Sequence, residues 1–164
     1  MSDLPAGDTR GRQPEESDKA RVDRELKELL DEIRTILPGV EILFGFLIIL
    51  PFEFSEELGG LERMLYLGAF LSVSAGLALL VAPPVDHRLR FRELDKERWL
   101  HRSNRLAIAA SAFVAVGIAL TVYLVVQTIV GGVLAGVIAA ANAAWIGWFW
   151  FGWPLVQRAR DRRR

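Results

Sequence analysis

The chain has 164 residues, of which 52% are hydrophobic and 24% charged, with a formal net charge of zero and no cysteine. The lack of cysteine excludes disulfides, thiolate catalysis and cysteine-ligated zinc. The charges fall in blocks, and the run from Leu106 to Trp153 contains no Asp, Glu, Lys, Arg or His. A spanning helix needs about 20 apolar residues. This run is therefore long enough for two such helices and indicates an integral membrane protein.

The N-terminal part of the chain is polar and divides in two. Residues 1–18 are rich in Gly, Pro and charge, so we expect a disordered tail. Residues 19–37 carry apolar side chains at steps of three and four, which is typical of an amphipathic helix. These side chains are Val22, Leu26, Leu29, Ile33 and Ile36. Pro38-Gly39 is expected to end this helix, which would lie on lipid or dock on protein.

Four membrane segments are predicted within residues 39–153, at about 39–54, 64–82, 106–130 and 133–153. Pro83-Pro84 is expected to end the second segment. The third and fourth are joined only by Gly131-Gly132, which predicts a tight antiparallel hairpin. The first is short, because Glu41 and Glu53 bound its uncharged run. A re-entrant hairpin broken at Pro51 is the alternative to a tilted span.

The basic residues predict the orientation. When both termini and the loop between the second and third segments lie in the cytoplasm, every Lys and Arg except Arg63 is on the cytoplasmic side. The basic tail, 154–164, would then lie against anionic headgroups. The expected fold class is all-α, an integral membrane four-helix bundle with an N-terminal cytoplasmic amphipathic helix.

Small residues repeat every four positions on the later segments, a spacing that lets helix backbones approach closely in lipid. They would serve packing within one chain or, through the two glycines of the fourth segment, a homo-oligomeric face. Asn142 is expected to form a hydrogen bond across a helix seam. The predicted packing residues are Gly68, Ser72, Gly76, Gly132, Gly136 and Ala140. Aromatic anchors at the membrane interface are expected at Trp145, Trp148, Trp150 and Trp153.

The chain shows no hydrolase, nucleotide-binding or metal motif, so we predict neither an enzyme nor a cofactor. Nucleic acid is not an expected partner, because the basic tail is short and tethered to the membrane. The candidate ionisable residue is Glu41, since a carboxylate within an apolar segment is costly. One interpretation places it at the start of a helix, paired with His87, Arg88 or Arg105 at the same level. The other makes it a proton carrier.

Three stretches stand out together: LPGVEILFGFLIILPFEF (37–54), APPVDHRLRFR (82–92) and HRSNRLA (101–107). They resemble a family of small four-helix bacterial membrane proteins of unknown function. The family pattern is an ELL-x-ELR helix, a GVQ-x-LF-x-FLL segment and an AP-x-x-x-HR end to the second helix. The matching pieces here are 28–34, 39–48 and 82–88, with Glu41 where the pattern has an amide. The resemblance implies the bacterial inner membrane, and some members carry the label of sodium:proton antiporter.

The expected function is that of a non-enzymatic structural, lipid-contacting or partner-binding component. Its partners would be the bilayer, a second copy of the chain, or an unidentified membrane or cytoplasmic protein. The alternative is a small proton- or cation-coupled transporter or channel that uses Glu41 near His87 and Arg88.

Overall fold

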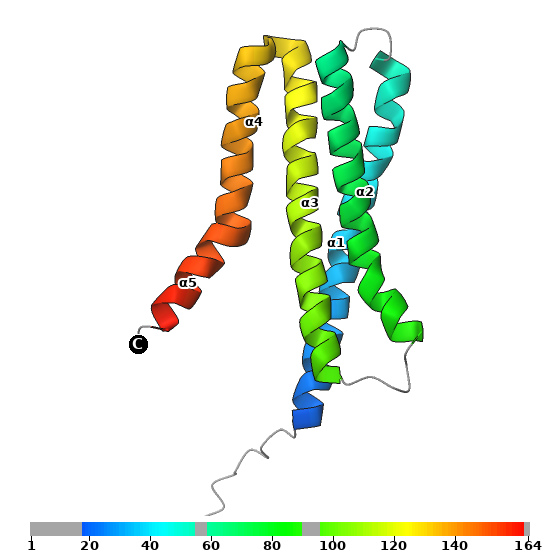
Figure 1. Cartoon of the computed structure of the whole chain (residues 1–164), viewed down its shortest axis with the longest axis vertical. Helices are drawn as coiled ribbons and strands as arrows, with labels where there is room; N and C mark the ends of the chain where they lie inside the picture. The colour runs from blue at the N-terminus through cyan, green and yellow to red at the C-terminus, as the bar shows by residue number, and fades with distance from the viewer. Residues whose placement is uncertain (1–17, 55–58, 90–95, 163–164) are drawn as a thin grey trace, which may run out of the picture.

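The computed structural model describes residues 18–54, 59–89 and 96–162, all of them helical apart from single residues at turns. Long antiparallel helices run side by side in Figure 1. They are α1 (Asp18–Phe54), α2 (Gly60–Leu89), α3 (Lys96–Val130) and α4 (Gly132–Gly147), which continues through a π-helix, η1 (Trp148–Gly152), into α5 (Trp153–Asp161). The all-α prediction is confirmed.

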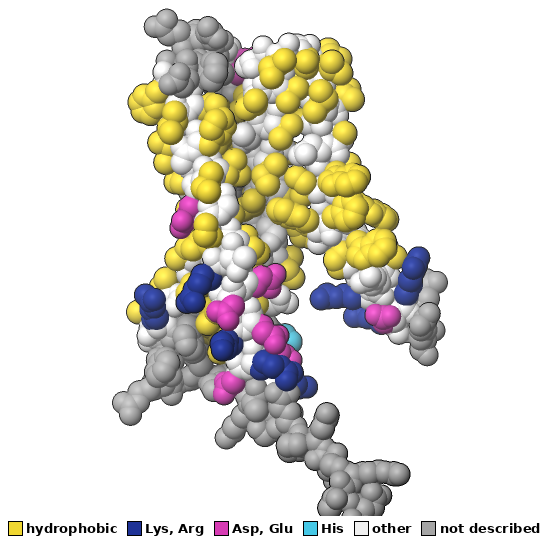
Figure 2. All heavy atoms as spheres, turned by 180° about the vertical axis from the view of Figure 1, so that it is seen from behind, with side chains coloured by type: hydrophobic (Ala, Val, Ile, Leu, Met, Phe, Trp, Pro, Cys, Tyr) yellow, Lys and Arg dark blue, Asp and Glu magenta, His cyan; other side chains and the backbone are white. Residues whose placement is uncertain are grey.

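Four stretches of these helices are long and apolar enough to cross a membrane. They are Arg21–Phe52, Gly60–Asp86, Arg98–Val130 and Gly132–Asp161. Many of their large apolar side chains point outward: Ile42 is 75% exposed and Val133 is 89% exposed. Figure 2 shows apolar side chains over most of the bundle and charged ones gathered near the end that carries the termini. This pattern fits a multi-pass membrane protein, whose outer surface meets lipid tails.

The helix boundaries expected at prolines are wrong. Helix α1 continues through Pro38, and α2 continues through Pro83 and Pro84. Helix α1 also continues through Pro51, which agrees with a continuous first segment and not with a re-entrant hairpin broken there. The reason is tertiary packing around Pro38 and Pro83. Ile33 and Val40 flank Pro38, and both are buried in the same core cluster. Pro83 is itself fully buried. In membrane helices, neighbouring helices and local adjustments compensate for the hydrogen bond that a proline removes.

The hairpin between α3 and α4 is as tight as the sequence predicts. Gly131 is the only residue between the two helices, and its φ of 87° lies in the left-handed region that favours glycine. Its amide donates to the Gln127 carbonyl at 3.2 Å, and its carbonyl accepts from the Ala135 amide at 3.0 Å. We call this end of the bundle, with the α1–α2 connection, the hairpin end, and the opposite end the terminal end.

Two contacts set the register of the first three helices. The Tyr66 hydroxyl of α2 donates to the Leu47 carbonyl of α1 at 2.9 Å. Helix α2 meets α3 closely at Gly76, where an added Cβ would lie 2.7 Å from Val114 Cγ2 and 3.2 Å from the Ala110 carbonyl oxygen. The main core cluster follows these seams, with Leu47, Val73 and Ala110 among its buried members. Within the described chain, α4 packs against α3 and not against α1 or α2.

Candidate functional site

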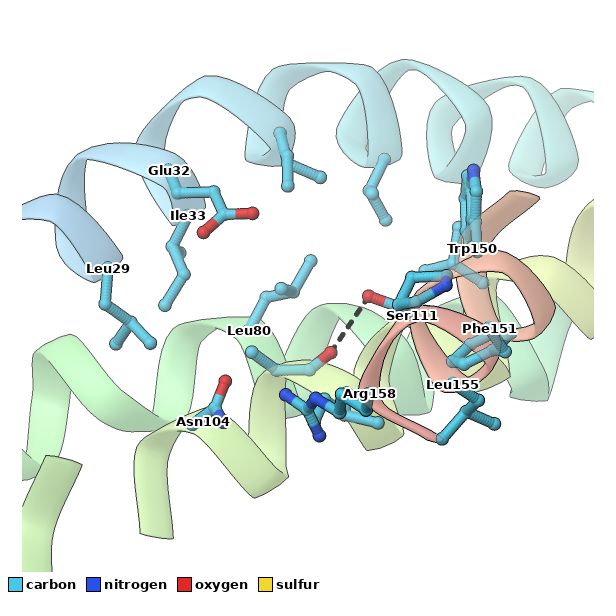
Figure 3. Close-up of a pocket in the computed structure, with 16 residues that line it drawn as sticks. Leu29, Glu32, Ile33, Leu80, Asn104, Ser111, Trp150, Phe151, Leu155 and Arg158 are labelled. Atoms are coloured by element: carbon cyan, nitrogen blue, oxygen red, sulfur yellow. Dashed lines mark hydrogen bonds between the residues drawn. The ribbon is translucent and has the colours of Figure 1, made fainter. Parts of the chain in front are cut away.

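A cleft of about 680 Å³ lies near the terminal end of the bundle. One wall is α1 and the other is η1 with α5, while α3 and Leu80 of α2 form the floor (Figure 3). Seen from behind, the same notch separates the arm that carries α5 from the rest of the molecule (Figure 2). The cleft therefore lies between the beginning and the end of the chain, and only the folded bundle creates it.

Pro154 explains why the cleft is open. It is the second residue of α5 and has no amide hydrogen to donate to the carbonyl four residues earlier. The five residues directly before α5, WFWFG, widen into the π-helix η1. Such π-turns are rare and often occur at functional sites. In Figure 1 the chain from η1 onward diverges from α3. The ring side chains of Trp150 and Phe151 line the space that this divergence leaves.

The cleft is polar at its mouth and apolar at its depth. Near the terminal end its lining holds the polar side chains Glu32 of α1, Asn104 of α3 and Arg158 of α5, together with Leu29 of α1. Toward the centre of the bundle the lining changes to apolar side chains, which include Ile36, Val40, Leu80, Val114 and Trp150. The hydroxyl of Ser111, also in the lining, is occupied by a hydrogen bond of 2.9 Å to the Ala107 carbonyl. The polar groups that a ligand could contact therefore lie at the mouth of the cleft.

Glu32 and Arg158 project into the mouth from opposite walls (Figure 3). Both side chains are exposed, and neither forms an ion pair with another residue that the structure describes. Their neighbours on α1 differ in this respect. Asp31 Oδ1 lies 3.9 Å from Arg34 Nη1, and Glu28 Oε1 lies 3.7 Å from Arg24 Nε. The mouth thus presents one uncompensated carboxylate facing one uncompensated guanidinium.

Glu41 does not lie at the start of a helix. It belongs to the continuous helix α1, its side chain is exposed, and no ion pair to it exists among the described side chains. Because Leu47 contacts Tyr66 in an antiparallel pair, Glu41 is level with Ser72 of α2. A helix-start interaction with free amide groups is therefore excluded for this carboxylate.

The register between the helices also places Glu41 at a different level along the bundle from its predicted partners, Arg88 and Arg105. Arg88 follows Ser72 by sixteen residues, which is about 24 Å of helix at 1.5 Å per residue. Arg105 precedes Ala110 by five residues and is level with the Pro83 region of α2, about 16 Å of helix from Ser72. His87 belongs to α2, but its side chain lies outside the described residues, as does that of Glu53. The helices do not bring Glu41, Arg88 and Arg105 to one level.

The small residues predicted to pack between helices differ in their surroundings on α2 and on α4. An added Cβ at Gly68 would lie 3.3 Å from Leu120 Cδ1, so Gly68 and Gly76 both face α3, and Ser72 between them is half-buried. On α4, the residue nearest to Gly132 and to Gly136 is Tyr123 of α3, whereas Ala140 is exposed. Gly117 of α3 was not among the predicted packing residues, although an added Cβ there would collide with Val73. The buried side chains of α4 are instead Ala135 and Ala139.

Asn142 does not make the expected hydrogen bond through its side-chain oxygen. Its Oδ1 atom is buried and has no hydrogen-bond partner among the described residues. The four tryptophans expected as anchors are Trp145, Trp148, Trp150 and Trp153, and each is exposed by 44–67%. Trp145 packs on Phe149 with ring centroids 4.8 Å apart. Of the four, Trp150 alone lines the cleft.

Glu32, Asn104 and Arg158 were not predicted as site residues, because each belongs to a charged or polar stretch of the sequence that is typical of a solvent-exposed surface. The available signal was Pro154, placed directly after an aromatic run at the end of an apolar segment. The predicted tail, 1–18, lies outside the described residues except for Asp18. Across the described ranges, no three His, Asp or Glu side chains gather into a group that could hold a metal ion.

Comparison with known proteins identifies a family, and that family is described as one of unknown function. No curated protein and no solved structure matches the chain. A family model described as a family of unknown function, DUF6328, matches residues 15–154 and so includes α1 to α4 and the lining of the cleft up to Pro154, but not Leu155 and Arg158. This confirms the resemblance to an unknown-function family. The chain belongs to the family of unknown function DUF6328.

Proposed function

We propose that this chain is a non-enzymatic, multi-pass protein of the bacterial inner membrane that holds one membrane lipid in the cleft between α1 and α5. The observation that carries the proposal is the polarity of the cleft, with a charged mouth and an apolar interior. A phospholipid has the same division between headgroup and acyl chains. The side chains at the mouth would orient it, while the apolar walls would accept its tails.

The depth of the cleft supports this proposal. Phe54 ends α1 at the hairpin end, and Glu32 lies 22 residues before it, which is about 33 Å of helix. Val40 lies 14 residues before Phe54, or about 21 Å. The hydrocarbon core of a bilayer is about 30 Å thick. If the hairpin end meets the outer surface of that core, Glu32 reaches the opposite headgroup layer and Val40 remains among the tails.

The distribution of basic residues supports an orientation with both termini in the cytoplasm, since only Arg63 falls on the other side. The cleft would then open into the cytoplasmic leaflet. The chain has no cysteine, so single-cysteine variants report position directly. A membrane-impermeant thiol reagent added to intact cells should label Gly60→Cys at the hairpin end and leave Arg160→Cys unlabelled. The reverse pattern would place the cleft in the outer leaflet.

Lipid binding is tested by native mass spectrometry of the full chain released from mild detergent. Ala107 lines the cleft, whereas Ala112, five residues further along α3, is exposed outside it. Ala107→Phe fills the cleft and should remove one retained phospholipid per chain. Ala112→Phe adds the same side chain elsewhere and should retain the lipid. Equal retention by both variants would mean that the lipid is not in the cleft.

A further inference from the structure

We infer that the cleft selects a phospholipid whose headgroup carries both a phosphate and a primary ammonium group, an aminophospholipid of the phosphatidylethanolamine class. This inference rests on the proposed lipid binding and adds the class of headgroup. The geometry behind it is the placement of Arg158 and Glu32 on opposite walls of one mouth (Figure 3). Arg158 binds the phosphate, and Glu32 accepts hydrogen bonds from the ammonium group.

Arginine suits the phosphate end of this headgroup. The planar guanidinium donates two parallel N–H bonds to two phosphate oxygens, a geometry that lysine does not provide. Arg158 lies on α5, and its side chain enters the cleft from the wall opposite α1. No carboxylate within the described chain is paired with it. Its charge is therefore available to a ligand in the mouth.

Glu32 decides between classes of phospholipid. A headgroup with only negative charge, such as phosphatidylglycerol, would meet Arg158 favourably but would face Glu32 with like charge. The neighbouring acids do not share this role, because Asp31 and Glu28 are each near an arginine on α1 itself, Arg34 and Arg24. A ligand that carries both a phosphate and a cationic group can pair with Arg158 and Glu32 at the same time.

The cation at Glu32 is a primary ammonium and not a choline. A carboxylate gains hydrogen bonds from N–H groups, which the quaternary nitrogen of choline lacks. Proteins that bind choline enclose it with aromatic rings. The rings of this cleft, Trp150 and Phe151, precede Arg158 by about two helical turns and belong to its deeper, apolar part. Among the described residues, the lining of the mouth consists of Leu29, Glu32, Asn104 and Arg158 and includes no aromatic ring.

The test is competition among three lipids for the full chain in mixed micelles, with bound phosphatidylethanolamine, phosphatidylcholine and phosphatidylglycerol counted by native mass spectrometry. The wild-type chain should retain phosphatidylethanolamine about two- to fivefold over each competitor, the range expected for charge pairs at exposed groups. Glu32→Gln should abolish this preference while lipid remains bound. Arg158→Gln should lower retention of all three.

Two variants serve as matched controls. Glu25→Gln removes an exposed carboxylate of α1 that is outside the cleft, and Arg160→Gln removes an exposed guanidinium of α5 that does not line it. Neither should change the lipid ratio. A Glu32→Gln chain with unaltered preference, or a wild-type chain that favours phosphatidylglycerol, would overturn the headgroup assignment and leave lipid binding intact. Retention that is insensitive to Ala107→Phe would instead overturn lipid binding in the cleft.

Discussion

The seam between α2 and α3 gives a quantitative prediction at Gly76. A methyl group added there would lie 2.7 Å from Val114 Cγ2 and 3.2 Å from the backbone oxygen of Ala110. Valine is stiff about χ1, so its methyl cannot swing aside easily. A backbone oxygen cannot move without its helix. We therefore expect Gly76→Ala to force α2 and α3 apart, at a cost of about 1–3 kcal/mol in the free energy of unfolding.

Replacing glycine by alanine also favours a helix, by about 1 kcal/mol. The variant Gly45→Ala isolates this term, because nothing lies within 4 Å of the added methyl group at that position of α1. The difference between the two variants is then the cost of the collision alone. At about 2–4 °C per kcal/mol for a chain of this size, Gly76→Ala should melt about 2–12 °C below Gly45→Ala in lipid nanodiscs. Equal melting temperatures would refute the close packing of α2 on α3.

Three further predictions concern single groups. Tyr66→Phe removes the hydrogen bond to Leu47 and should cost about 1 kcal/mol in the free energy of unfolding, measured by the same melting assay. Gly131→Ala should cost about 1–3 kcal/mol, because its φ of 87° and ψ of 159° form a conformation that is essentially restricted to glycine, whereas Gly132→Ala, outside the turn, should cost less than half as much. Glu41→Gln should leave the melting temperature unchanged or raise it, because the exposed carboxylate has no ion pair in the described chain. A pH-gradient-driven flux in proteoliposomes that this variant abolishes would instead favour transport.

Hydropathy predicted the number of apolar segments because the cost of placing charge in a bilayer is a local property of the sequence. It also located the α3–α4 hairpin, where α3 ends at Val130 and Gly131 alone intervenes. The expectation that a proline ends a helix was wrong because it also considers only the local sequence. Ile33 and Val40 are buried on either side of Pro38, and tertiary packing of this kind overrides the preference of a single residue.

The cleft could not be predicted in the same way, because it depends on register between distant segments. Glu32 and Arg158 are separated by most of the chain, and nothing near either residue in the sequence indicates the other. Glu41 attracted attention for a local reason, its charge within an apolar run. Its position was then wrong, because the predicted break at Pro38 made Glu41 the start of a new helix, whereas α1 continues through Pro38 and places Glu41 in a helix interior.

An experimental structure of the full chain in nanodiscs that contain phosphatidylethanolamine tests the central claim most directly. We predict density for one phospholipid between α1 and α5, with its headgroup between Glu32 and Arg158 and its tails beside Val40 and Val114. A direct ion pair between Glu32 and Arg158 across a closed cleft would contradict the account, and so would a helix of a second copy seated in its place.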